Sequence, residues 1–381
     1  MGQTKKHIIL IAGESSGDLH AAELVKEITL LNSDISFSGL GGPKMAEQGV
    51  TLYHDLTQMA VVGFVEVIRH YKEIKKLFDL ILNKIESTKP DAVILIDYPG
   101  FNLRLAKKIK ELKINTKIIY YISPQVWAWK KKRVFTIQKL VDEMLVFFPF
   151  EKDFYARYGI NVHCVGHPLV DIVRVRENKK DTLERHKLKD YCTTIGLLPG
   201  SRIKEVETLL PIMLRSAAIL QKKHPMIQFL ILKAPSIDPM LIKRLLHTTQ
   251  LNAKIIEQNP YDCINACDAC IVASGTATLE TAILQKPMVI VYKTALLTWI
   301  LAKFFIKIKC IGLVNIVAGK KIVDECVQFD ANGKNIAHKI QKLIKDDEAS
   351  NDVKSELKKV KSLLGEPGAA KRAAEITCQS I

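Results

Sequence analysis

Short apolar runs alternate with longer amphipathic segments along the chain. In the first half the strand candidates are Ile8–Ala12, Ile35–Ser38, Ala92–Ile96, Lys117–Ile122, Met144–Phe147 and Val162–Val165. Two of them, "AVILI" and "KIIYYI", are nearly continuous runs of β-branched and aromatic residues, which are typical of parallel strands covered on both faces. Helical patterns such as "EVIRHYKEIKKLFDLILNKI" and "LRLAKKIKEL" lie between them. This order predicts a doubly wound α/β sheet.

The same alternation restarts after a charged stretch, "DIVRVRENKKDTLERHKLKD", in which hydrophobic patterning is weak. The runs "TTIGLLP", "QFLILKA", "AKIIEQ", "ACIVAS" and "PMVIVYK" then predict a second set of strands. We therefore expect an α/β protein with two Rossmann-like domains facing across a cleft, residues 1–170 and 171–366. A last helix, within residues 367–381, follows the break at "GEPG". It is expected to pack back on the first domain or on a partner subunit.

Composition adds a preference for anionic partners. The chain has 381 residues, of which 48% are hydrophobic, and a formal net charge of +16. Such a balance favours a phosphorylated ligand, an acidic membrane surface or nucleic acid, although a lysine-rich solvated surface explains it equally well. Neither a signal-peptide pattern nor an apolar run long enough for a spanning helix is visible, so we expect a cytoplasmic protein. Its cysteines, including those in "CINACDAC", are interpreted as reduced core residues rather than cluster ligands.

Two loops of the second half are typical of anion sites. "LLPGSRIKEVE" places Ser201 and Arg202 where a strand ends and a helix begins, and free N–H groups with an arginine there suit a diphosphate. "ASGTATLE" repeats the arrangement with Ser274, Gly275 and Thr276, and Glu280 follows one helical turn later on the same face. A carboxylate at that position is suited to ribose hydroxyls. The alternative for both loops is an ordinary capped helix with solvated side chains.

Neither loop carries a Walker lysine motif or a D-x-D metal pair, so the sequence argues against phosphoryl transfer from ATP. We expect a nucleotide diphosphate held by backbone groups, an arginine and helix dipoles. No metal ion or other cofactor is expected.

In the first half, Asp97 follows a buried strand directly, before a Pro-Gly turn. A carboxylate there is placed to remove a proton from a hydroxyl nucleophile, although an N-cap or a structural acceptor is the alternative. The opening loop, "AGESSGD", lacks the G-x-G-x-x-G fingerprint of dinucleotide sites and instead carries Glu14 and Asp18.

Two further segments combine apolar and basic residues. "SPQVWAWKKKRV" places Trp127 beside a basic cluster that includes Lys130 and Arg133, which suits a phosphate-bearing or membrane-interfacial ligand. "TALLTWILAKFFIKIKC" is apolar with interspersed lysines, and either a core helix or an interfacial helix has this pattern. No nucleic-acid fold signature accompanies these segments, so no nucleic-acid partner is expected.

With these residues in view, the chain resembles the lipid-A-disaccharide synthases, which are peripheral membrane glycosyltransferases of bacteria. The resemblance runs nearly end to end. It is carried by the following motifs: "AGESSGD", "GGPKM", "VVGFVEV", "IDYPGFN", "SPQVWAWKKKRV", "PFEKDFY", "VGHPLVD", "LLPGSR", "SGTATLE" and "NIVAGKKIVDECVQ".

The resemblance implies a glycosyltransferase B fold without a required metal. It implies transfer from UDP-2,3-diacylglucosamine to 2,3-diacylglucosamine 1-phosphate, through a β-1,6 bond with inversion, at the cytoplasmic face of the inner membrane. Asp97 would then be the general base. Glu14, Ser15, Ser16, Asp18, Trp127, Lys130 and Arg133 would lie on the acceptor side.

On the donor side, the resemblance assigns UDP to Ser201, Arg202, Ser274, Gly275, Thr276 and Glu280. The late motif adds Asn315, Gly319, Glu325 and Gln328, which would close the donor pocket. A homodimer is a further expectation. Two competing interpretations remain at this level: a UDP-sugar 2-epimerase of the same architecture, and a basic membrane- or RNA-binding module without catalysis.

Overall fold

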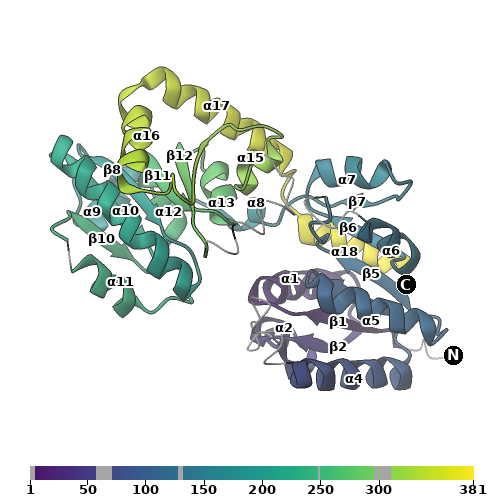
Figure 1. Cartoon of the computed structure of the whole chain (residues 1–381). Helices are drawn as coiled ribbons and strands as arrows, with labels where there is room; N and C mark the ends of the chain where they lie inside the picture. The colour runs from purple at the N-terminus through teal and green to yellow at the C-terminus, as the bar shows by residue number, and fades with distance from the viewer. Residues whose placement is uncertain (1–4, 57–70, 128–131, 248, 296–298, 300–309) are drawn as a thin grey trace. The chain divides into compact units, whose positions relative to one another are not determined.

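The computed structural model describes residues 5–56, 71–127, 132–247, 249–295, 299 and 310–381. The chain forms two compact units, and the colours of Figure 1 follow the chain from its N-terminus in purple to its C-terminus in yellow. Unit 1 comprises Met1–Pro168 together with Gly365–Ile381, and unit 2 comprises Leu169–Leu364. The boundaries expected from the sequence, after residues 170 and 366, lie two residues further along the chain in each case.

In the described part of unit 1, seven parallel strands form one sheet in the order β3-β2-β1-β4-β5-β6-β7. These strands are β1 (His7–Ala12), β2 (Ser36–Gly41), β3 (Thr51–Asp55), β4 (Ala92–Ile96), β5 (Lys117–Tyr121), β6 (Glu143–Val146) and β7 (His163–Cys164). The helices are α1 (Ser15–Leu31), α2 (Pro43–Glu47), α4 (Tyr71–Thr88), α5 (Pro99–Glu111), α6 (Arg133–Leu140), α7 (Pro149–Ala156) and α18 (Ala369–Ser380). Every side chain of β4 is buried, as its apolar run predicts.

In the described part of unit 2, six parallel strands follow the order β10-β9-β8-β11-β12-β13. They are β8 (Thr193–Leu198), β9 (Ile227–Leu232), β10 (Ala253–Ile256), β11 (Ala269–Ala273), β12 (Met288–Tyr292) and β13 (Asp324–Val327). The helices are α8 (Leu169–Ile172), α9 (Lys179–Arg185), α10 (Ile203–Lys223), α11 (Pro239–Leu246), α12 (Pro260–Ala266), α13 (Ala277–Ile283), α15 (Leu313–Val317), α16 (Gly333–Lys345) and α17 (Asp347–Leu363).

The sequence missed two strands, β3 and β13, and both lie at the edge of their sheet. β3 has no fully buried side chain, and β13 has only one, Cys326. Strand prediction depends on a buried face, so a short edge strand without an apolar run leaves little signal.

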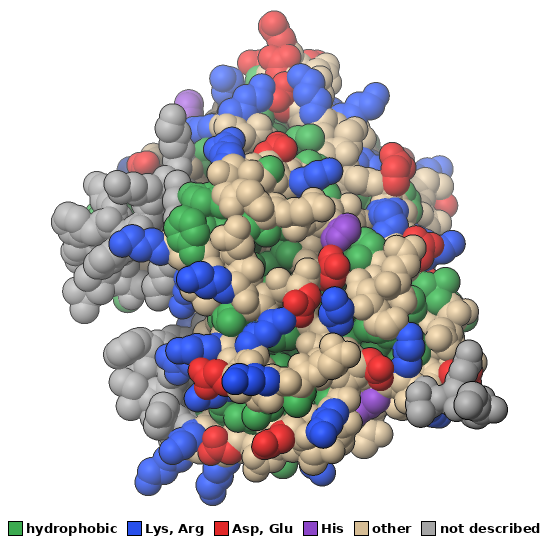
Figure 2. Space-filling model, turned by 90° about the vertical axis from the view of Figure 1, so that its right-hand side faces the viewer, with side chains coloured by type: hydrophobic (Ala, Val, Ile, Leu, Met, Phe, Trp, Pro, Cys, Tyr) green, Lys and Arg blue, Asp and Glu red, His purple; other side chains and the backbone are tan. Residues whose placement is uncertain are grey.

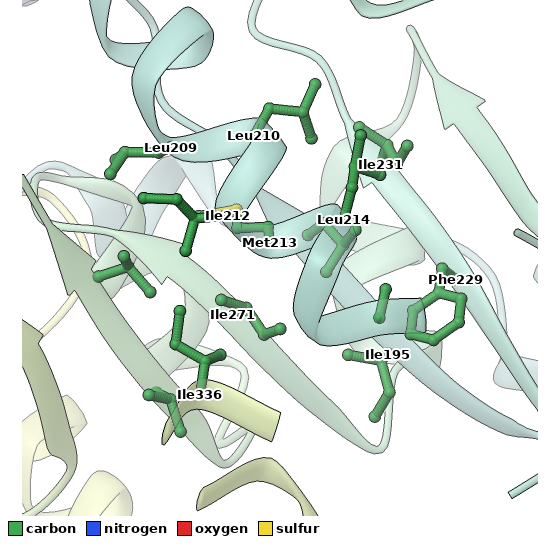
Figure 3. Packing of buried hydrophobic residues seen from close by; sticks show 14 of the residues in the cluster. Ile195, Leu209, Leu210, Ile212, Met213, Leu214, Phe229, Ile231, Ile271 and Ile336 are labelled. Atoms are coloured by element: carbon green, nitrogen blue, oxygen red, sulfur yellow. The ribbon is translucent and has the colours of Figure 1, made fainter. Parts of the chain in front are cut away.

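Helix α10 forms the centre of the core in unit 2. Its residues Leu209, Ile212 and Met213 pack against apolar side chains of the strands and of α16, as Figure 3 shows around Ile271 and Ile336. Burial of such side chains contributes roughly 1.5–3 kcal/mol each. A sheet fixed in this way holds the loops after its strands in place, and those loops carry the candidate residues.

The last helix, α18, packs against α1, so it belongs to unit 1 despite its position in the sequence. Figure 1 shows it in yellow among the blue and purple elements. The Arg372 guanidinium donates to the carbonyl of Val165, at 2.6 and 2.9 Å, and Lys6 Nζ donates to the carbonyl of Ile381 at 2.7 Å. Both ends of unit 1 therefore meet at one place.

None of the helices in the described part of the chain combines the length and the apolar character that crossing a bilayer requires.

Candidate active-site residues

The loops that follow β1 and β4 lie side by side in unit 1. The two strands pair in parallel, from Ile8 opposite Ala92 to Ala12 opposite Ile96. The first loop carries Glu14 and the second carries Asp97. The negative charge of Glu14 contributes to raising the pKa of Asp97, so the two carboxylates share one electrostatic environment.

Asp97 occupies an unusual turn. Both Asp97 and Tyr98 have a φ of 45°, in the left-handed region that aspartate tolerates and tyrosine rarely adopts. Burial, followed by the charge of Glu14, raises the pKa of Asp97 to about 6, against a smaller opposing effect of the Tyr98 N–H. Around pH 7 most molecules thus carry an ionised carboxylate with few stabilising contacts, which is the state a general base requires.

The opening loop makes room for this turn. A Cβ atom on Gly13 would lie 2.5 Å from ring atoms of Tyr98, so only glycine lets the ring pack there. On its other side Tyr98 stacks on Phe101, with 5.8 Å between ring centroids. Gly13 of "AGESSGD" therefore leaves the space that the ring of Tyr98 occupies in the Asp97 turn.

Asp18 binds the backbone of a neighbouring loop. Its carboxylate is buried and accepts the N–H groups of Gly42 at 2.8 Å, Lys44 at 3.0 Å and Met45 at 3.1 Å. These donors belong to the "GGPKM" motif at the start of α2. The contacts favour a scaffold role over the acceptor contact that the resemblance implies for Asp18. Ser15 and Ser16, in contrast, are exposed in the first turn of α1.

Trp127 is fixed by a buried glutamate that the sequence analysis did not single out. Its indole N–H donates to Glu151 Oε1 at 3.2 Å, and its ring lies edge-on to Phe150. Glu151 also accepts the N–H groups of Phe147 and Phe148, at 3.2 Å each. Burial raises the pKa of Glu151 to about 7. This carboxyl group thus joins the loop after β5 to the loop after β6, and the "PFEKDFY" motif was the signal for it.

Arg133 opens α6 and is half-buried. Its charge tends to lower the pKa of the buried Tyr120 hydroxyl, while burial of that hydroxyl raises the pKa more strongly. Lys130, which was predicted to lie beside it, is outside the described residues.

Two histidines near the same edge of the sheet are desolvated and neutral at physiological pH. Burial lowers the pKa of His20 to about 4 and that of His167 to about 3. Both rings pack against Phe147, with centroid distances of 5.5 and 4.9 Å. His163, four residues before His167, instead bonds Glu143 at 2.9 Å.

In unit 2, the "PGSR" loop lies between β8 and α10, where the sequence placed it, and its contact with a nucleotide stays a prediction. Gly200 has a φ of +111°, Arg202 is the N-cap residue of α10, and both Ser201 and Arg202 are exposed. The carboxylate of Glu205 accepts the Ser201 N–H at 3.0 Å and would collide with a Cβ on Gly200. The loop is therefore fixed by its own helix, with the guanidinium left open to solvent.

The second anion loop follows β11, the neighbour of β8. Ser274 Oγ donates to the carbonyl of Ile311 at 3.2 Å, and a Cβ on Gly275 would meet no atom within 4 Å. Thr276 is the N-cap residue of α13. Glu280 is largely buried near the hydroxyl of Tyr261, and burial raises its pKa. Because β8 and β11 are adjacent, Arg202 and the serine–glycine–threonine loop follow the same edge of the sheet.

The late motif is bonded internally. Asn315 is buried, accepts the N–H groups of Ile322 and Val323, and donates to Val323 and Glu325. Glu325 in addition accepts the N–H groups of residues 311 and 312, at 2.9 Å for the shortest bond to each.

Gln328 bonds the backbone of Thr294 in both directions, at 2.9 and 3.2 Å, and Gly319 turns the chain after α15 with a φ of +69°. These contacts give the late motif a scaffold role. Its contact with a donor stays a prediction.

Basic residues are not gathered into one patch on the face that Figure 2 shows. Lysine and arginine side chains are spread over it with acidic ones between them. In the described part of the chain, no group of three or more His, Cys, Asp or Glu side chains is placed to hold a metal ion. Cys263, Cys267 and Cys270 are buried thiols.

Comparison with known sequences gives a full-length match. A family model described as lipid-A-disaccharide synthetase matches residues 8–378. The chain is 43% identical to the lipid-A-disaccharide synthase of Geobacter sulfurreducens, over 99% of this chain and 98% of that protein. It is 42% identical to the enzyme of the same name from Syntrophus aciditrophicus, over 97% and 96% of the two chains.

Comparison with solved structures identifies the fold. The chain is similar to an S. aureus MnaA–UDP co-structure, with a TM-score of 0.65, 11% identity and coverage of 99% and 98%. It is also similar to the calicheamicin glycosyltransferase CalG4, with a TM-score of 0.61, 13% identity and the same coverage. At such identities the likeness establishes the two-domain glycosyltransferase B architecture, which epimerases share, and nothing about the reaction.

Proposed function

Since the chain belongs to the lipid-A-disaccharide synthetase family, we propose the following reaction for it. The protein joins UDP-2,3-diacylglucosamine to 2,3-diacylglucosamine 1-phosphate through a β-1,6 bond, with inversion at the anomeric carbon and release of UDP. The observation that carries this proposal is the state of Asp97, a desolvated carboxylate in a strained turn with a raised pKa.

The chemistry we assign to Asp97 is proton removal. The 6-hydroxyl of the acceptor loses its proton to the carboxylate while its oxygen forms a bond to the anomeric carbon. The bond between that carbon and the diphosphate oxygen breaks, and UDP leaves with the electron pair. A base with a pKa near 6 is ionised at pH 7.5 and still basic enough to assist, which is the compromise that general-base catalysis favours.

Unit 2 is the proposed donor-binding unit. Arg202 and the N–H groups of the two loops would receive the diphosphate, and Glu280 with Tyr261 would receive the ribose. The UDP in the S. aureus structure, and the UDP-GlcNAc in a Neisseria meningitidis 2-epimerase of similar fold, support a uridine nucleotide. Arg202 would also stabilise the charge that develops on the leaving diphosphate.

Three further expectations belong to this proposal. The reaction needs no metal ion, so turnover should be the same with EDTA as with Mg²⁺. The protein binds the cytoplasmic face of the inner membrane, where its acylated substrates lie, and the exposed Phe135 beside basic residues at the start of α6 supports this. It acts as a homodimer.

The experiment that tests the function is UDP release from the diacyl UDP-sugar, measured with and without the diacyl-sugar phosphate. Release that depends on the acceptor, together with a disaccharide phosphate product, is the expected result. Incubation with UDP-N-acetylglucosamine alone tests the alternative, because a 2-epimerase would convert it without an acceptor. Binding of vesicles or RNA without any turnover would indicate the non-catalytic alternative.

A further inference from the structure

The turn that presents Asp97 requires support from its surroundings. Two consecutive non-glycine residues with a φ of 45° are unfavourable in an isolated chain, and such a conformation persists only where neighbouring groups over-determine it. The N–H of Asp97 donates to the carbonyl of Tyr121 at 3.1 Å, which continues the pairing of β4 with β5 for one more residue. That bond fixes the start of the turn and leaves the peptide that follows Asp97 to be held by other groups.

Two buried side chains hold that peptide. The hydroxyl of Tyr120, on β5, donates to the carbonyl oxygen of Asp97 at 2.6 Å. The amide of Asn102, on α5, donates to the same oxygen at 2.7 Å and to the carbonyl of Ile96 at 3.2 Å. Tyr120 and Asn102 are both 0% exposed. Three donor contacts from two different elements therefore converge on the peptides that flank Cα of Asp97.

The carbonyl oxygen of the Asn102 side chain indicates that the amide is held in place by its contacts with the turn. Its Oδ1 is buried and has no hydrogen-bond partner among the described residues. Rotating the amide by half a turn would point that oxygen at two carbonyl oxygens, so the observed orientation is the favourable one. An unsatisfied buried acceptor is costly and calls for a compensating contact. At this position the compensation is the pair of bonds that the NH₂ group gives to the turn.

We infer that Tyr120 and Asn102 are positioning residues for the transfer reaction: they clamp the carbonyl of Asp97 and thereby fix the direction of its carboxylate. The inference rests on the proposed role of Asp97 as the base. Removing one of the two donors frees the turn to relax toward ordinary backbone angles, which moves the carboxylate without altering its chemistry. A displacement of about 1 Å at a reacting group can cost on the order of 100-fold in rate.

The test compares the single variants Tyr120→Phe, Asn102→Leu and Asp97→Asn in steady-state assays in which each substrate is varied. Tyr120→Phe should lower kcat roughly 10–100-fold. It should leave KM for the UDP-sugar within about twofold, because Tyr120 makes no contact in the proposed UDP-sugar site. Asn102→Leu should act in the same direction, and Tyr120→Phe covers the case in which that variant does not fold. Tyr53→Phe is the matched control. The Tyr53 hydroxyl donates to Ser38 Oγ at 2.9 Å, and Tyr53 lies on the outermost strand β3, which is separated from β5 by three other strands.

The double variant separates positioning from stability. If Tyr120 acts through Asp97, Tyr120→Phe should cause no further loss of kcat in the Asp97→Asn background, whereas an independent effect would add in full. Full kcat in Tyr120→Phe, or full additivity, overturns the inference. Full activity of Asp97→Asn alone overturns the proposed base instead, so the two failures are distinguishable.

Discussion

Unit 1 and unit 2 each contain a half-buried carboxylate that the sequence assigned to the active site, and the two have opposite surroundings. Glu325 in unit 2 accepts two backbone N–H groups and the amide of Asn315. For Asp97 in unit 1, burial and the negative charge of Glu14 raise the pKa, against a smaller lowering effect of the Tyr98 N–H.

The difference separates scaffold from chemistry. A carboxylate whose oxygens are filled by internal donors stabilises the loops that supply them, and it has little capacity left for a substrate. A carboxylate that is desolvated and poorly bonded is unstable in its charged form and therefore ready to take a proton. The same contrast holds within unit 1, where Asp18 is bonded like Glu325.

The largest expected effect is the loss of kcat when the poorly bonded carboxylate, Asp97, is replaced. Asp97→Asn should lower kcat by roughly 10²–10⁴, because the side chain keeps its shape and its tolerance of the left-handed turn but loses its basicity. The measurement is UDP release at saturating substrates. Asp18→Asn is the matched control: it should retain kcat per folded molecule and show its effect in thermal unfolding. The reverse pattern would assign the base to Asp18.

The next effect concerns stability in unit 2. Glu325→Ala leaves two N–H groups and an amide without their acceptor, and the free energy of unfolding should fall on the order of 3 kcal/mol. Urea unfolding measures it, and Glu325→Gln, which keeps one acceptor oxygen, should lose less. If Glu325→Ala keeps its stability but loses activity, Glu325 contacts the UDP-sugar, as the resemblance implies.

A smaller effect is expected where unit 2 has an open cation. Arg202→Ala should weaken UDP binding roughly 10–100-fold, since a charge-assisted bond contributes about 1.5–3 kcal/mol. Calorimetry with UDP measures this, and Arg202→Lys should lie in between because it cannot form a fork of two bonds. An unchanged Kd in Arg202→Ala would remove the arginine from the diphosphate site.

The smallest effect refines the account of Asp97. In the unmutated protein, kcat should rise with pH through about 6. Asp97 must be deprotonated to act as the base, and burial with the charge of Glu14 raises its pKa to about 6. Glu14→Gln removes the smaller of the two causes, so the acid limb of the kcat–pH profile should move to lower pH. Burial, the larger cause, remains. A limb that stays in place or moves upward contradicts this.

The sequence predicted the two-sheet architecture because most strands are nearly continuous apolar runs that alternate with amphipathic helical segments. It also predicted the loops that carry Asp97, Arg202 and the serine–glycine–threonine segment, because these follow strand ends. Short edge strands without an apolar run, such as β13, gave no such signal.

The roles of bonded residues were harder to predict. Asp18, Asn315 and Glu325 belong to motifs that carry the resemblance, yet their oxygens are filled by backbone donors close by in the fold. Motif membership does not distinguish a residue that touches a substrate from one that holds the loop beside it. Glu151 and Asn102 were missed because the contacts that define them join different elements, and spacing along the chain does not report such contacts.

The docking of α18 on α1 has a consequence for how the protein is made. Because unit 1 is completed by the last residues of the chain, a nascent polypeptide leaves the ribosome with the apolar face of α1 uncovered while all of unit 2 is being synthesised. Unit 2, a continuous segment, is free to fold in that interval. The waiting surface on α1 is where we expect chaperone contact during translation, and where a ribosome stalled before Gly365 would release an aggregation-prone product.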